Sequence, residues 1–95
     1  DMEKQWLSGV VQLVNFMQDS RIWAENICQI TVKDNGDLLM IPRQGKERFI
    51  FGLPSGFESK FDRMGRYYTT ILPEKGAGYY STVNVKYNGQ IVCRK

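Results

Sequence analysis

Apolar residues recur with a helical period near the start of the chain. Spacings of four, three, one and three place five of them on one face of a helix: Trp6, Val10, Leu13, Val14 and Met17. Asp19 and Ser20 interrupt this stripe. Because serine is a preferred N-cap, Ser20 predicts a short second helix that carries Trp23. We expect both tryptophans to pack in the core.

The pattern changes from helical to strand-like at Cys28. Cys28, Ile30 and Val32 alternate with polar residues, so we expect these three side chains on the apolar face of a strand. Residues 34–37 are Asp-Asn-Gly-Asp, and Asn-Gly tolerates the positive φ of a tight hairpin turn. The next two strands are expected at 38–41 and 48–51.

A long helix is predicted between residues 55 and 72. Its apolar stripe consists of Phe57, Phe61, Met64, Tyr68 and Ile71. Ser55 and Glu58 form a capping-box pattern, in which the side chain of each residue bonds to the backbone N–H of the other. Pro73 and the glycines that follow it are expected to end the helix.

The polar side of this helix carries Lys60, Arg63 and Arg66. A solvated helix face is one interpretation of these cations, and contact with an acidic partner is the other. Gly65 lies among them and costs the helix up to about 1 kcal/mol unless another element packs closely against its backbone.

The chain ends in a predicted β-hairpin. Residues 81–87 alternate between apolar and polar side chains, Asn88-Gly89 is a strong two-residue turn signal, and residues 90–94 return. A two-residue turn at that point pairs Tyr87 with Gln90, Val85 with Val92 and Val83 with Arg94.

Together these elements predict an α+β fold. The meander joins the first three strands as antiparallel neighbours, and the long helix is a right-handed crossover that makes strands 3 and 4 parallel. The result is a five-stranded mixed sheet in the order 1-2-3-4-5 with the helices on one face. Cys28 and Cys93 then lie on opposite edges, roughly 19 Å apart, so we expect no disulfide between them.

Composition fits one globular domain spanning residues 1–95. The chain has 42% hydrophobic residues, 24% charged residues and a net charge of +3. It contains no histidine, which removes the commonest catalytic base and zinc ligand. We therefore expect no enzyme activity, no cofactor and no metal. No apolar run approaches the roughly 20 residues that span a bilayer, and no signal-peptide pattern is present. The chain begins abruptly, and from this start we expect a fragment of a longer protein.

The terminal strand is the most informative feature for function. It lies at an edge of the predicted sheet, where unpaired N–H and C=O groups are available to an incoming extended chain. Arg94 and Lys95 also suit a role in protecting this edge against self-association. Physical reasoning alone does not decide between docking of a partner and protection against self-association, so both hypotheses are kept.

Three motifs, in order along the chain, resemble the bacterial cell-division family FtsQ/DivIB. Residues 80–92 resemble its C-terminal hairpin, residues 16–30 resemble the entry into its β domain, and Phe49-Ile50-Phe51-Gly52 resembles the strand before its crossover helix. Asn84 stands where the family usually has aspartate, and Arg94 stands where some members carry an aromatic residue.

The resemblance implies a non-catalytic scaffold domain outside the membrane, in the periplasm or its equivalent at the division septum. The parent protein would also carry a membrane helix and a POTRA domain. Its partners would be FtsB-like and FtsL-like bitopic proteins, bound by β-strand addition at the last strand. The expected partner-binding residues are Lys86, Tyr87, Gln90, Ile91, Val92, Cys93 and Arg94.

A nucleic-acid-binding sheet is the alternative from another functional class. It would use Tyr79, Tyr80, Tyr87 and the basic side chains near them as a stacking surface. Its affinity for nucleic acid would fall steeply as salt rises, whereas strand addition would respond weakly.

Overall fold

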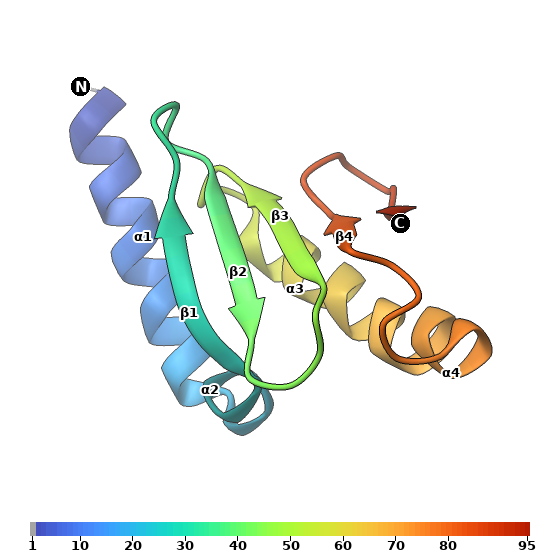
Figure 1. Cartoon of the computed structure of the whole chain (residues 1–95). Coiled ribbons are helices and arrows are strands. Elements are labelled where there is room, and N and C mark those ends of the chain that lie inside the picture. Colours follow the sequence, from blue (N-terminus) through green and yellow to red (C-terminus); the bar gives the residue numbers. More distant parts are fainter. Residues whose placement is uncertain (1) are drawn as a thin grey trace.

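A five-stranded mixed sheet forms the centre of the structure, a computed structural model that describes residues 2–95 (Figure 1). The strand order is β1-β2-β3-β4-β5, and β3 pairs with β4 in parallel, which confirms the topology predicted from the sequence. The elements in chain order are α1 (Met2–Asp19), α2 (Arg21–Asn26), β1 (Ile27–Val32), β2 (Leu38–Pro42), β3 (Arg48–Gly52), α3 (Phe57–Arg66), the π-helical turn η1 (Tyr67–Ile71), α4 (Leu72–Lys75), β4 (Thr82–Asn84) and β5 (Val92–Arg94).

The hydrophobic core lies between the sheet and the helices, which cover one of its faces (Figure 1). Alternate strand residues point inward, and helix side chains meet them from α1, α3 and η1. Burying these large side chains is the main stabilising contribution to the fold. The most buried are Leu13, Leu38, Met40, Phe49, Phe51, Phe61, Met64, Tyr67, Val83 and Val85.

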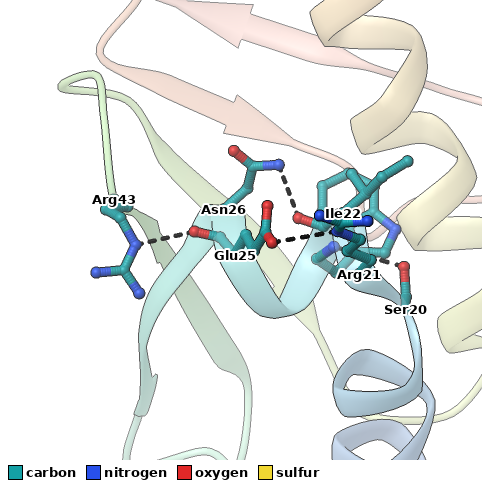
Figure 2. Close-up of polar contacts among 7 residues, drawn as sticks. Ser20, Arg21, Ile22, Glu25, Asn26 and Arg43 are labelled. Carbon is teal, nitrogen blue, oxygen red and sulfur yellow. Dashed lines mark hydrogen bonds and ion pairs between the residues drawn. The ribbon is translucent and has the colours of Figure 1, made fainter.

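The helix α2 fastens the start of β1, as Figure 2 shows. Ser20 Oγ accepts a hydrogen bond from Trp23 N at 3.4 Å, which confirms Ser20 as the N-cap. Arg43, which directly follows β2, binds the end of α2: its Nε donates to Glu25 O at 2.9 Å and its backbone N donates to Asn26 O at 2.8 Å. The end of β2 is therefore tied to the end of α2.

The predicted apolar face of the first strand is wrong for Cys28 and Val32, which are both exposed. Ile27 pairs with Pro42 and Gln29 pairs with Ile41, so Cys28 is an extra residue in a β-bulge. The bulge shifts the alternation by one position, and Ile27 and Ile30 both pack on the core despite their odd spacing.

The predicted boundaries of the long helix are also wrong. Gly56, with φ 66° and ψ 29°, occupies the N-cap position without a side-chain hydrogen bond, so Ser55 and Glu58 form no capping box. The helical path continues beyond Pro73 as far as Lys75. At the end of η1 the Leu72 amide donates to Tyr67 O, five residues back, as in a π-helix. A new helical turn, α4, then begins at Leu72, so Pro73 lies in its first turn, where the missing N–H of proline is tolerated.

Candidate functional site

The last strand lies at an edge of the sheet, as the sequence predicted. Within residues 2–95, β5 pairs with one strand only, β4. The three pairs are Thr82 with Arg94, Val83 with Cys93 and Asn84 with Val92. The Arg94 carbonyl also accepts from the Ser81 amide at 2.8 Å. The outer flank of β5 therefore has no neighbouring strand from the described part of the chain.

The register and extent of the hairpin differ from the prediction. The observed pairing of Val83 with Cys93 is one residue away from the predicted pairing of Val83 with Arg94. Strand pairing stops after Asn84, and residues 85–91 form a longer connection. Gly89 has φ 71° while Asn88 lacks a positive φ, so the turn is not the mirror-image type that matches the twist of two directly paired strands.

The structure distributes the predicted partner-binding residues over β5 and the connection before it. Val92, Cys93 and Arg94 form the strand, and Gln90 and Ile91 immediately precede it. The connection folds back through a hydrogen bond from Gln90 N to Tyr87 O at 3.2 Å. Among these residues, Tyr87 is a large exposed ring, with 54% of its surface accessible.

Lys86 has contacts within the chain that the sequence did not indicate. Its ammonium lies 3.6 Å from Asp37 Oδ2 and 5.2 Å from the centre of the Tyr87 ring. Its side chain crosses Gly52, whose φ is +84°, and a Cβ built at Gly52 would lie only 2.7 Å from Lys86 Cβ. Glycine is therefore required at position 52, where the Lys86 side chain passes over the backbone. The ion pair between Lys86 and Asp37 links the β1–β2 turn to the connection before β5.

Arg63 and Lys60 are buried, so the prediction of a solvated helix face is wrong for these two residues. The Arg63 guanidinium donates to Val85 O from Nε at 3.1 Å and from Nη2 at 2.7 Å. Lys60 Nζ donates to Leu53 O at 2.6 Å, and burial, followed by the nearby Arg63 charge, lowers the pKa of Lys60. Long aliphatic stems allow such cations to lie beneath loops while their polar ends bind carbonyls. Arg63 positions the start of the connection that leads to β5.

Cys93 of β5 packs against the hydrophobic core. Burial raises the pKa of the Cys93 thiol, which favours its neutral form. Burial and the neighbouring Glu47 carboxylate raise the pKa of Tyr67, whose hydroxyl donates to Glu47 Oε2 at 3.3 Å. The same two causes raise the pKa of Tyr68 to about 12. At neutral pH these side chains serve packing and hydrogen bonding, and among residues 2–95 the outer flank of β5 has no strand neighbour.

Comparison with known proteins gives one match, to a family model. A family model described as FtsQ/DivIB, C-terminal related, matches residues 1–94. Searches of curated proteins and of solved structures found no match. Within residues 2–95, no helix combines the length and apolar character needed to cross a membrane. Because the match covers nearly the whole chain, this chain belongs to the FtsQ/DivIB C-terminal related family of bacterial cell-division proteins.

Proposed function

We propose that this chain is a non-catalytic interaction domain of the division machinery that docks FtsB-like and FtsL-like bitopic proteins by β-strand addition. The observation that carries this proposal is the position of β5 at the sheet edge with one strand neighbour in the described part of the chain. An extended partner segment would pair with Val92–Arg94 and enlarge the sheet by one strand.

The short length of β5 limits what backbone pairing contributes. A three-residue strand offers roughly three hydrogen bonds to a partner, or about 1.5–4.5 kcal/mol before ordering costs. A complex with a millimolar dissociation constant already requires about 4 kcal/mol. Side chains must therefore supply much of the affinity, and the exposed Tyr87 ring is the best placed to do so because aromatic anchors dominate many interfaces.

Family membership, combined with this mode of binding, supports a proposal for the cellular setting. We place the domain outside the cytoplasmic membrane at the division septum, within a parent protein that also has a membrane helix and a POTRA domain. FtsB-like and FtsL-like proteins would then present their extracytoplasmic segments on the same side of the membrane as β5.

A pair of proline substitutions tests strand addition. Successive N–H groups of an antiparallel edge strand alternate between its inner and outer flanks, so Val92→Pro and Cys93→Pro each remove a donor from a different flank. We expect one of these variants to keep nearly normal stability and lose binding to the extracytoplasmic segment of the host's FtsB-like protein. Urea unfolding identifies that variant, and calorimetry measures its binding. Normal binding by the stable variant would contradict strand addition.

The nucleic-acid alternative is a separate hypothesis, with Lys75 Nζ and Lys95 Nζ lying 5.4 Å and 4.4 Å from the centre of the Tyr79 ring. Tyr79 and Tyr80 pack edge to face with ring centres 4.7 Å apart, whereas Tyr87 lies beside Lys86 in the connection before β5. A salt titration of partner binding separates the two functions, since strand addition responds weakly to ionic strength.

A further inference from the structure

The open face of the sheet, the side that no helix of residues 2–95 covers, carries a row of side chains that crosses all five strands (Figure 1). Directly paired residues of neighbouring strands lie on the same face of a sheet. On the helix side, the core row ends at β5 with Cys93, which pairs with the buried Val83. Val92 and Arg94 precede and follow Cys93, so both face the open side. The row on the open face consists of Thr31, Leu39, Ile50, Asn84 and Val92.

The strands bring positive charge to the open face and no negative charge. No residue of β1–β5 is aspartate or glutamate, and the only charged strand residues are Arg48 on β3 and Arg94 on β5. Both pair with Thr82 of β4, so they lie in one row, two strand spacings or roughly 10 Å apart. Both are exposed. This row therefore ends in a cation at the strand edge that has no neighbour within residues 2–95.

Arg94 differs from the cations near it because its side chain has no partner in the described chain. Arg48 Nη1 donates to Lys46 O at 3.3 Å, and the Lys95 ammonium lies 4.4 Å from the centre of the Tyr79 ring. The Arg94 guanidinium forms no ion pair, hydrogen bond or ring contact with any residue of the range 2–95. It is therefore available to a group that another molecule brings to the edge.

The backbone orientation of Arg94 favours close side-chain contact with an added strand. Its carbonyl accepts from the Ser81 amide at 2.8 Å and so points toward β4. The N–H and C=O of one strand residue point to the same flank, so Arg94 would form a non-hydrogen-bonded pair with a residue on the outer flank. In an antiparallel ladder the Cα atoms of such a pair are about 4.5 Å apart, closer than in a hydrogen-bonded pair. Val92, two residues earlier, has the same orientation.

From the register of β5, the charge of the open face and the unpartnered guanidinium, we infer that the segment pairing with β5 carries an aspartate or glutamate opposite Arg94. Two positions away, opposite Val92, it carries a β-branched or aromatic residue that extends the row on the open face. Opposite charges that face each other across a ladder stabilise it, and like charges destabilise it. A second copy of β5 does not fit, because Val92–Arg94 contains no carboxylate. This inference rests on the proposed strand addition and names the chemistry of the segment that it accepts.

Three peptides test the inference on the intact chain. They are acetylated and amidated nine-residue peptides of threonine and valine that differ at one position, which is glutamate, glutamine or lysine, with a valine two residues further on. NMR titration of the Cys93 amide reports both the place of binding and the dissociation constant. The unmodified chain should bind the glutamate peptide about 1.5- to fivefold more tightly than the glutamine peptide, which is the range for cross-strand ion pairs. The lysine peptide should bind most weakly.

Charge variants locate this preference. Arg94→Gln should bind the glutamate and glutamine peptides equally, and Arg94→Glu should prefer the lysine peptide. Arg48→Gln is the matched control, because it removes the other strand cation at three strand spacings, or roughly 14 Å, from the added strand. That distance exceeds the screening length of about 8 Å in physiological salt, so this variant should keep the original preference. Both arginines are exposed, and urea unfolding should show that all three variants remain folded.

Three results would overturn the inference. Equal binding of the glutamate and glutamine peptides by the unmodified chain would leave strand addition intact but remove the role of Arg94 in choosing the segment. Self-association of Arg94→Gln in sedimentation, with its preference for glutamate unchanged, would assign Arg94 to protection of the edge. No shift of the Cys93 amide with any of the peptides would count against strand addition itself, and the inference would fall with it.

Discussion

The two edges of the sheet are held in very different ways. β1 has six residues, and both of its ends are fastened: α2 and Arg43 tie the start, and a hydrogen bond from Lys33 N to Asp37 O at 2.9 Å closes the turn that follows it. β5 has three residues and follows a connection of residues 85–91 that lies outside the strands. Its described strand pairing comes from β4 alone.

This difference shows that the longer edge strand is not automatically the better docking site for a partner strand. The bulge at Cys28 makes β1 irregular, and bulged edges are poor templates for another strand. β5 lacks such a bulge in its pairing and has few contacts to rearrange when another segment arrives. The less firmly held edge is therefore the better candidate for docking.

The largest effect expected from this comparison is on stability. Ile27→Ala removes a side chain that is 5% exposed at the start of β1, and it should lower the free energy of unfolding by about 2–5 kcal/mol. Val92→Ala on the half-buried β5 should lower it by less than about 1 kcal/mol. Urea unfolding of both variants measures the difference. Equal losses would show that β5 is as integral to the fold as β1.

A smaller effect should follow from loosening the cap that holds α2 at the start of β1. Ser20→Ala removes the acceptor of the Trp23 amide and should cost about 1 kcal/mol in thermal or urea unfolding. Ser8→Ala, inside the exposed part of α1, is the control and should change stability by no more than about 0.5 kcal/mol. If the Ser20→Ala variant is as stable as the Ser8→Ala control, the Ser20 cap does not stabilise the start of β1.

The smallest expected effect is a difference in alkylation rate between Cys28 on β1 and Cys93 on β5, and measuring it does not require a change in stability. Cys28 is exposed on β1, whereas burial raises the pKa of Cys93 on β5. Iodoacetamide should therefore label Cys28 faster at pH 7, as followed by mass spectrometry with Cys28→Ser and Cys93→Ser variants. The raised pKa leaves fewer thiolates at a given pH, so labelling of Cys93 should keep rising above the ordinary thiol pKa of about 8.5. Faster labelling of Cys93 at pH 7 would show that β5 opens readily in the free domain.

Much of the architecture was predictable because its signals are local. Gly36 has φ 87° in the β1–β2 turn, as the Asn-Gly pair indicated, and the helical segment is long enough to return the chain in parallel beside β3. These signals set the order of the strands. The same reasoning placed the last strand at an edge, which is the central feature of the proposed docking site.

The details of that site depended on contacts between distant residues. Lys86 meets Asp37, and Arg63 binds the carbonyl of Val85, although neither pair is close in sequence.

By itself, the amino-acid sequence determined the class of fold, the strand order and the edge position of β5, because periodicity, turn residues and connection lengths act over short stretches of chain. The tertiary structure alone decided the bulge at Cys28, the shifted register of β4 and β5, and the burial of Arg63. Each of these results depends on how several elements compete for the same core and the same backbone hydrogen bonds, and a pattern read along one segment does not contain that competition.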